Sequence, residues 1–415
     1  MINYKEAKKI LTESKIKIKD EVINTSKSLN RINTLDIYCS VNYPAGTNAA
    51  FDGFAVNSKE TNRLNKNNSQ NFKILKTISA GDNPRTNKIK KNVTIEVMTG
   101  ALIPKGFDTI IPIEKIIFDK DKRYIKINEK IKKKRHIRFV GSDYKKKDLI
   151  IKKGTIIQPS HILAFKTLGI TKIKVKKKPN ILFFSTGNEI SNKKKIVNWK
   201  VRNSNSHYIK ALSKNFMFNF IDGGILRDKD EKLFKKKIEK SIKSKIDIII
   251  TSGAVSAGKY DFVPYVIKKL NLSNFFKGVL IRPGKPILFA KLKGFEKVIF
   301  GLPGNPMSSS ACFRFFVYPY LLNILGVKTE KAFKARLKNN FSKKKKLVRF
   351  LKAKLTSTNN GKLMIEVLEG QESFRIKSFV KSNVWGLFKD GKSNFRSGEL
   401  IDCYSPIGSN INIFK

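Results

Sequence analysis

Three loops rich in glycine, serine and threonine hold the residues of this sequence that are best suited to chemistry. They read STGNE, TSGAVSAGKYD and GLPGNP, at residues 185–189, 251–261 and 301–306, and each follows an apolar run typical of a strand. Glycine lets a ligand approach the backbone closely, and hydroxyl and backbone N–H groups donate hydrogen bonds to anions. Together the three loops predict a site that cradles phosphates.

Charged residues accompany these loops. Glu189, Asp228 and Asp261 lie in or near them, and carboxylates are compatible with bound phosphates where Mg²⁺ bridges the two. We interpret them as candidate metal ligands, with helix capping as the alternative for the two aspartates. Arg282 and Lys285, in the turn RPGKP, would add charge-assisted contacts worth roughly 1.5 to 3 kcal/mol each.

These loops belong to a segment in which strands and helices alternate. The runs NILFFSTG, FIDGGILR and IDIIITSG predict strands, and two helical patterns separate them. In the second pattern Phe234, Ile238 and Ile242 share one helix face among lysines. The alternation predicts a parallel sheet covered by helices on both sides, with ligands bound beyond the carboxyl ends of the strands.

The whole chain is predicted to be a multidomain α/β protein. We expect an N-terminal helical and linker domain, a mostly β domain, the central parallel-sheet α/β domain and a small C-terminal β domain. The helical and linker domain is predicted to comprise residues 1–45 and 141–178, and the mostly β domain residues 46–140. The α/β domain is predicted at 179–326 and the C-terminal β domain at 327–415.

Composition limits the possible classes of function. The formal net charge is +54, but the basic residues are mostly lysines spread over the whole length, which indicates compositional drift and argues against a nucleic-acid groove. Cys39, Cys312 and Cys403 are far apart and have no metal-ligand spacing, as in a reduced cytoplasm. No signal peptide or run of about 20 apolar residues is present, so we expect a cytoplasmic protein without a membrane segment.

Eight segments, taken in order, resemble one family. The chain is similar to the molybdopterin molybdenumtransferases, the family of bacterial MoeA and the C-terminal part of eukaryotic gephyrin. The matching segments read AAFDGFAV, AGDN, VMTGALIPKGFDTIIPIE, FFSTGNEI, RNSNSHYI, SGAVSAGKYDFV, RPGKP and GLPGNPMS, between residues 49 and 308.

The resemblance implies an enzyme that inserts molybdate into adenylylated molybdopterin and releases AMP. It further implies dependence on Mg²⁺ and a homodimer whose active site lies in a cleft between subunits. Two other interpretations stay open: a molybdopterin- or nucleotide-binding adenylyltransferase built on residues 180–326, and a non-catalytic basic scaffold that binds RNA. About 170 residues before that segment and about 90 after it argue against the adenylyltransferase.

The resemblance also assigns roles to residues. Asp52, Thr99, Asp228 and Asp261 are the implied catalytic residues, and Glu189 joins the last two as a metal ligand. The expected substrate-binding residues are Ser185, Thr186, Gly187, Ser252, Gly253, Ser256, Gly258, Arg282, Lys285, Pro303, Gly304, Asn305, Pro306, Arg349 and Ser373. RPGKP and GLPGNP would then be two rigid corners of one pocket.

Some positions depart from the family pattern. Phe51 and Phe54 replace the usual methionine and tyrosine, Glu96 stands where a basic residue is common, and Lys259 stands where an acid is usual. Ala254 replaces a glycine in the second loop. Because alanine strongly prefers negative φ, we expect a reshaped turn there.

Overall fold

The computed structural model describes residues 1–86, 89–215, 217–255, 261–328 and 330–408. The chain forms two compact units. Unit 1 comprises Met1–Leu35, Lys153–Ile162 and Lys172–Lys415, and unit 2 comprises Asp36–Lys152 and Leu163–Thr171. The first 35 residues thus group with the α/β region, and the boundaries of the four expected domains stay predictions.

The central sheet of unit 1 is mixed. Its order is β16-β13-β17-β21-β20-β18; the first four strands are parallel, and β20 and β18 follow in antiparallel pairings. The turn RPGKP joins β18 to β20 and therefore lies at the same edge as the carboxyl ends of the parallel strands. The bounds are β13 (Asn180–Thr186), β16 (Asn219–Leu226), β17 (Ile248–Ser252), β18 (Leu272–Lys277), β20 (Leu288–Leu292) and β21 (Val298–Leu302).

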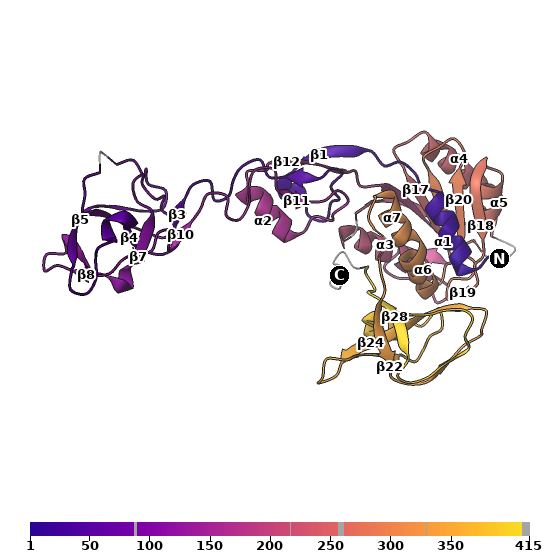
Figure 1. Cartoon of the computed structure of the whole chain (residues 1–415). Coiled ribbons are helices and arrows are strands. Elements are labelled where there is room, and N and C mark those ends of the chain that lie inside the picture. Colours follow the sequence, from indigo (N-terminus) through magenta and orange to yellow (C-terminus); the bar gives the residue numbers. More distant parts are fainter. Residues whose placement is uncertain (87–88, 216, 256–260, 329, 409–415) are drawn as a thin grey trace. The chain divides into compact units, whose positions relative to one another are not determined.

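Helices cover both faces of this sheet, as the alternation predicts (Figure 1). Buried strand residues are mostly apolar, with hydroxyl residues at the carboxyl ends of β13 and β17, and successive side chains point to opposite faces. One face packs against α1, α3, α6 and α7, and the other against α4 and α5. The helices are α1 (Tyr4–Glu13), α3 (Ser204–Asn215), α4 (Glu231–Ile242), α5 (Phe262–Lys268), α6 (Pro306–Cys312) and α7 (Tyr318–Ile324), with a π-helical turn (Phe313–Val317) between the last two.

The amphipathic patterns in the sequence correspond to this packing. Phe234 and Ile238 of α4 are fully buried, as their shared face predicted. Asp230, not Asp228, occupies the position before α4, and its carboxylate accepts the amide of Arg227 at 2.7 Å. Asp228 is therefore not the residue that caps α4.

The C-terminal sheet of unit 1 closes on itself. Its order is β19-β24-β25-β22-β28-β26, and an additional pairing joins β26 to β24. The Asn359-Asn360-Gly361 turn connects β24 to β25. The strands are β19 (Ile281–Arg282), β22 (Phe333–Leu337), β24 (Val348–Ser357), β25 (Leu363–Val367), β26 (Val384–Phe388) and β28 (Leu400–Tyr404); β23 (Phe341–Ser342) pairs with β27 (Asn394–Phe395), and α8 (Lys377–Lys381) precedes β26.

Short elements complete unit 1. β1 (Asp20–Asn24) pairs antiparallel with β12 (Lys172–Lys176), and β14 (Ile190–Ser191) pairs with β15 (Val201–Arg202). A 3₁₀ turn (Thr25–Lys27) follows β1. The helix α2 (Pro159–Thr167) contains a boundary between the two units.

Unit 2 is mostly β, as predicted. Its larger sheet has the order β7-β4-β6-β5-β9-β8, and two short ladders join β10 to β3 and β11 to β2. Its elements are β2 (Ile37–Tyr38), β3 (Asn48–Ala49), β4 (Gly53–Val56), β5 (Gln70–Ile78), β6 (Val93–Val97), β7 (Thr109–Pro112), β8 (Ile117–Phe118), β9 (Tyr124–Ile127), β10 (Ile137–Arg138), β11 (Leu149–Ile151) and the 3₁₀ turns Ser58–Thr61 and Ile113–Lys115.

Some lysines are buried. Lys343 is 8% exposed and Lys352 is 2% exposed, and both are in the C-terminal domain. Each ammonium group donates to three backbone carbonyls, so its burial is compensated by hydrogen bonds. Over the part of the chain that the structure describes, no helix is long and apolar enough to cross a membrane.

Candidate functional site

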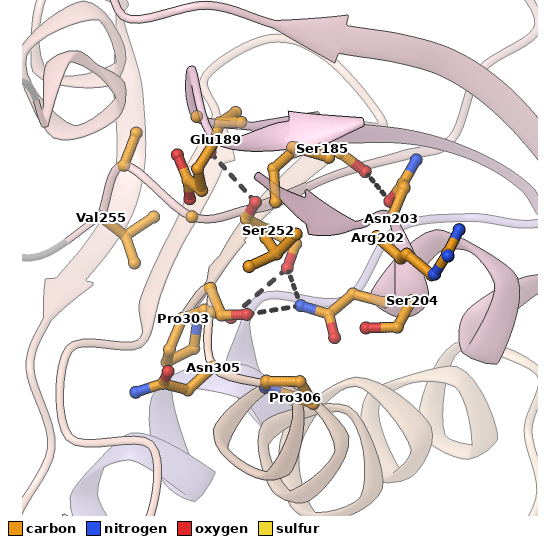
Figure 2. Close-up of a pocket in the computed structure, with 18 of the residues that line it drawn as sticks. Ser185, Glu189, Arg202, Asn203, Ser204, Ser252, Val255, Pro303, Asn305 and Pro306 are labelled. Atoms are coloured by element: carbon orange, nitrogen blue, oxygen red, sulfur yellow. Dashed lines mark hydrogen bonds between the residues drawn. The ribbon is translucent and has the colours of Figure 1, made fainter. Parts of the chain in front are cut away.

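A cavity of about 670 Å³ opens at the carboxyl ends of β13, β17 and β21 (Figure 2). All three predicted loops contribute to it, and we call it the loop cavity. Of the substrate-binding residues expected from the sequence, those that line it are Ser185, Thr186, Gly187, Ser252, Gly253, Pro303, Gly304, Asn305 and Pro306.

Glycines allow the three loops to pack closely. A side chain at Gly253 would meet the carbonyl oxygen of Thr186 at 2.5 Å, and a Cβ atom at Gly304 would lie 3.5 Å from the Cα atom of Gly253. Gly253 also has φ of +105°, which L side chains rarely adopt. At Gly187 a side chain would collide with the carboxylate of Glu189. Glycine is therefore required at Gly253 for the close packing of the first two loops, and Gly187 is favoured by its φ of +136°.

Hydrogen bonds between side chains and backbone fix the loops to one another (Figure 2). The Thr186 hydroxyl donates to the carbonyl of Ser252 at 3.0 Å. The Asn205 amide donates to the Ser252 hydroxyl at 2.8 Å and to the Gly304 carbonyl at 2.7 Å. Asn205 thus ties the second loop to the third, so its effect on the cavity is to position both.

The three candidate metal ligands, Glu189, Asp228 and Asp261, all line the loop cavity. Asp261 precedes α5, but its side chain makes no capping hydrogen bond to that helix. Within the described residues no group of three His, Cys, Asp or Glu side chains is close enough to hold a metal ion alone. Mg²⁺ commonly binds through one or two carboxylates and substrate phosphates, so these residues fit such an ion when a phosphate shares it.

Ala254 has a φ of +51°, the left-handed conformation that a glycine would adopt readily. The alanine thus keeps a positive φ at the cost of local strain. The expected reshaping of the turn stays a prediction. Ser256, Gly258 and Lys259 lie outside the described residues.

A second cavity of about 890 Å³ lies at the junction of the α/β and C-terminal domains, and we call it the basic cavity. Arg282, Lys285 and Ser373 line it. Of the RPGKP turn, only Pro286 lines the loop cavity. The GLPGNP turn contributes residues to both the loop cavity and the basic cavity. Both turns thus line one pocket, the basic cavity, as the sequence predicted. Four residues form a wall common to the two cavities, namely Pro286, Pro303, Asn305 and Phe374.

Two arginines meet beside the basic cavity. Arg282 of β19 pairs in register with Arg349 of β24, and both line an adjoining hollow of about 460 Å³. Burial, and secondarily the positive charge of Arg282, lowers the pKa of Arg349. The buried Nε atom of Arg349 has no hydrogen-bond partner within the described part of the protein. Two adjacent guanidinium groups, one of them with an unused Nε donor, are well suited to bind an oxyanion.

A loop from the C-terminal domain supplies Ser373 and Phe374. The Lys352 ammonium donates to the carbonyls of Gly370 and Arg375 at 2.7 and 2.9 Å, which holds the two ends of this loop together. The Ser373 carbonyl accepts the amide of Met307 at 3.2 Å, and its hydroxyl accepts from the Asn305 amide at 3.1 Å. The loop is therefore anchored both in its own domain and on the GLPGNP turn.

Asp52 and Thr99 lie together in unit 2. The Asp52 carboxylate accepts the amide of Thr99 at 2.6 Å and its hydroxyl at 2.8 Å. These hydrogen bonds, the one from the amide foremost, lower the pKa of Asp52. Glu96, one of the departures from the family pattern, accepts the hydroxyl of Thr77 at 2.5 Å on the neighbouring strand. The catalytic role of Asp52 and Thr99 stays a prediction.

Several residues of the site were not singled out from the sequence. Arg202, Asn203, Ser204 and Asn205 all line the loop cavity, and Asn203 accepts the hydroxyl of Ser185 at 2.6 Å. The segment RNSNSHYI was recognised as a matching motif, but its polar residues were not assigned. The asparagines of this segment lie at a strand–helix junction near the predicted site, and this position could have indicated them as site residues.

Fold and cavity together define a class of protein, one with a molybdopterin-binding domain. Residues 183–323 match the family model described as a probable molybdopterin binding domain. Residues 2–169 match the MoeA N-terminal region (domain I and II), and residues 334–405 match the MoeA C-terminal region (domain IV). The chain belongs to the molybdopterin molybdenumtransferase family.

Relatives extend over nearly the whole chain. A molybdopterin molybdenumtransferase of Staphylococcus epidermidis is 30% identical over 406 residues, which are 97% of this chain and 94% of the relative. One of Haemophilus influenzae is 30% identical over 398 residues, 95% of each. The crystal structure of a molybdopterin biosynthesis MoeA protein from Pyrococcus horikoshii aligns with a TM-score of 0.81 at 26% identity, covering 97% of this chain and 99% of that one.

Proposed function

We propose that this protein is an enzyme that inserts molybdate into adenylylated molybdopterin and releases AMP, forming the molybdenum cofactor. The observation that carries the proposal is the wall shared by the two cavities. The loop cavity offers neutral donors, three carboxylates and Arg202, and the basic cavity offers five cations. An adenylylated pterin and a metal oxyanion would thus be bound side by side, with the pterin dithiolene directed toward the wall.

Binding in the loop cavity follows from its donors. The backbone N–H groups of the glycine-rich loops suit the pterin phosphate and the nucleotide, and the hydroxyls of Ser185, Thr186 and Ser252 hold these loops in place by donating within the protein. One or two of the carboxylates of Glu189, Asp228 and Asp261 would hold Mg²⁺ together with phosphate oxygens. When bound, that ion neutralises phosphate charge during the release of AMP.

In the basic cavity, Arg282 and Lys285 would hold molybdate through charge-assisted hydrogen bonds. When the two dithiolene sulfurs bind molybdenum in place of one oxygen, that oxygen leaves as water with the two thiol protons. The residues of the shared wall keep both reactants oriented, so positioning and electrostatics supply the catalysis. The separate cleavage of the phosphoanhydride consumes water and yields AMP and the pterin phosphate.

We also propose that the enzyme is a homodimer and that Asp52 and Thr99 contribute to the site. The support is the family of the chain together with the hydrogen-bonded Asp52–Thr99 pair. Light scattering at moderate salt is expected to give twice the chain mass of 47.3 kDa. A monomeric mass would contradict this part of the proposal.

The proposal is tested by following AMP release from adenylylated molybdopterin, molybdate and Mg²⁺. We expect turnover by the wild type and a loss of at least about 100-fold in Asp261→Asn and Asp52→Ala, a loss typical of removing a group that stabilises the transition state. Glu239→Gln is the control, since Glu239 is an exposed carboxylate of α4 that lines neither cavity. Absence of turnover by the wild type, with steeply salt-dependent RNA binding, would favour the scaffold interpretation.

A further inference from the structure

Three consecutive lysines, Lys344 to Lys346, form an exposed turn between β23 and β24, and all three line the basic cavity. The sequence motifs and the resemblance assigned no role to this lysine turn. It faces the same space as Arg282 and Lys285. The cavity therefore has a second basic wall, which the C-terminal domain supplies.

The backbone of the lysine turn is held in place from beneath. The buried ammonium group of Lys343 donates to the carbonyls of Leu347 and Lys392 at 2.8 and 2.7 Å, and more weakly to that of Lys344 at 3.4 Å. The Gly391 amide donates to the carbonyl of Lys345 at 3.0 Å. These bonds fix the turn while its three side chains stay exposed, so the ammonium groups are presented from a rigid base.

The charge of the basic cavity is strongly positive. Arg282, Lys285 and the lysine turn contribute five cations, and the carboxylate among the lining residues is that of Glu372. Glu372 is itself paired with Arg375, with 3.4 Å between Oε2 and Nε. A concave surface of one sign raises the local concentration of small ions of the opposite sign and the rate at which they are captured.

We propose that the lysine turn captures molybdate, a tetrahedral dianion, from solution and passes it to Arg282 and Lys285. This inference rests on the proposed function and adds a residue set that determines how efficiently the oxyanion is used. Capture by an exposed charge acts before the chemical step, so it alters kcat/KM for molybdate and leaves kcat unchanged. It also weakens with salt, since the Debye length falls from about 10 Å at 0.1 M to about 3 Å at 1 M ionic strength.

The test compares two variants that each lose three positive charges. K344Q/K345Q/K346Q removes the lysine turn, and K236Q/K240Q/K243Q removes three exposed lysines of α4 and its C-terminal end, which line neither cavity. At about 0.05 M salt we expect kcat/KM for molybdate to fall roughly tenfold in the first variant only, a factor at the low end for electrostatic steering. At about 0.5 M salt the difference should shrink to less than about threefold.

Equal effects of the two variants, or an unchanged kcat/KM in the first, would overturn the inference. If the wild type releases no AMP, the proposed function is refuted instead. Molybdate binding alone would then test the role of the lysine turn. Equilibrium dialysis with molybdate should show weaker binding in the first variant than in the α4 control. Identical molybdate binding, with RNA affinity lost in the first variant, would assign the turn to nucleic acid and refute the inference.

Discussion

The two cavities of unit 1 share a wall but are built by different means. The loop cavity consists of strand-end loops whose positions are fixed by glycine contacts and neutral hydrogen bonds. The basic cavity is lined by Arg282 and by lysines: the pairing of β19 with β24 holds Arg282, and the buried ammonium group of Lys343 holds the lysine turn. The difference shows that one sheet edge can bind two anionic ligands when a second domain, here the C-terminal domain, adds positive charge to only one of the two cavities.

The sharpest test of this difference is Arg282→Gln. Loss of a charge-assisted hydrogen bond costs about 1.5 to 3 kcal/mol, so kcat/KM for molybdate should fall roughly 10- to 100-fold. Affinity for adenylylated molybdopterin, measured by calorimetry, should change less than about threefold, because Arg282 does not line the loop cavity. Arg396→Gln, in the C-terminal domain and lining neither cavity, is the control. Equal losses for both ligands would remove the distinction between the cavities.

Asn205→Ala should have the opposite selectivity and a smaller effect. The variant loses the hydrogen bonds to Ser252 and Gly304, each worth about 1 kcal/mol. We expect adenylylated molybdopterin to bind roughly 5- to 10-fold more weakly, while KM for molybdate stays the same. Asn219→Ala, at the beginning of β16, is the control. A change in the KM for molybdate as large as the change in pterin affinity would show that the shared wall couples the two sites.

Ala254→Gly tests how rigidly the loop cavity is held, and we expect the smallest effect. Glycine relieves the positive φ but adds chain entropy to the unfolded state, so the net stabilisation should be at most about 1 kcal/mol. Thermal unfolding should shift upward by about 1 to 3 °C. The matched Ala211→Gly change in α3 should lower stability by about 1 kcal/mol instead. A downward shift for Ala254→Gly would show that the turn is unstrained.

Much of the α/β domain was predictable because its signals are local. Apolar runs indicated the strands, the spacing of Phe234 and Ile238 indicated the buried face of α4, and small residues after the strands indicated the loops. Parallel strands bring their carboxyl ends to one edge, so the loop cavity follows from topology. The resemblance to a known family supplied the activity, which periodicity and spacing did not.

The basic cavity was not predictable in the same way. Its geometry depends on Ile281–Arg282, two residues that leave one sheet and pair with another, and so short a strand has no periodicity. The burial of Lys343 and Lys352 could not be predicted either. In a chain with 86 lysines and arginines, the local sequence does not indicate which ammonium groups will donate hydrogen bonds to backbone carbonyls. Only the packed structure separates these lysines from the exposed ones.

The pairing of β19 with β24 also has a consequence for exchanging parts between relatives. The C-terminal sheet receives one of its strands from the stretch between β18 and β20, within the α/β domain. A graft cut at the linker near residue 327 would leave that edge unpaired, exposing backbone N–H and C=O groups of Val348 and Arg349 to foreign strands. A chimera that carries residues 278–287 along with the C-terminal sheet keeps the edge covered, and so defines the smallest cassette that evolution or an engineer can transplant intact.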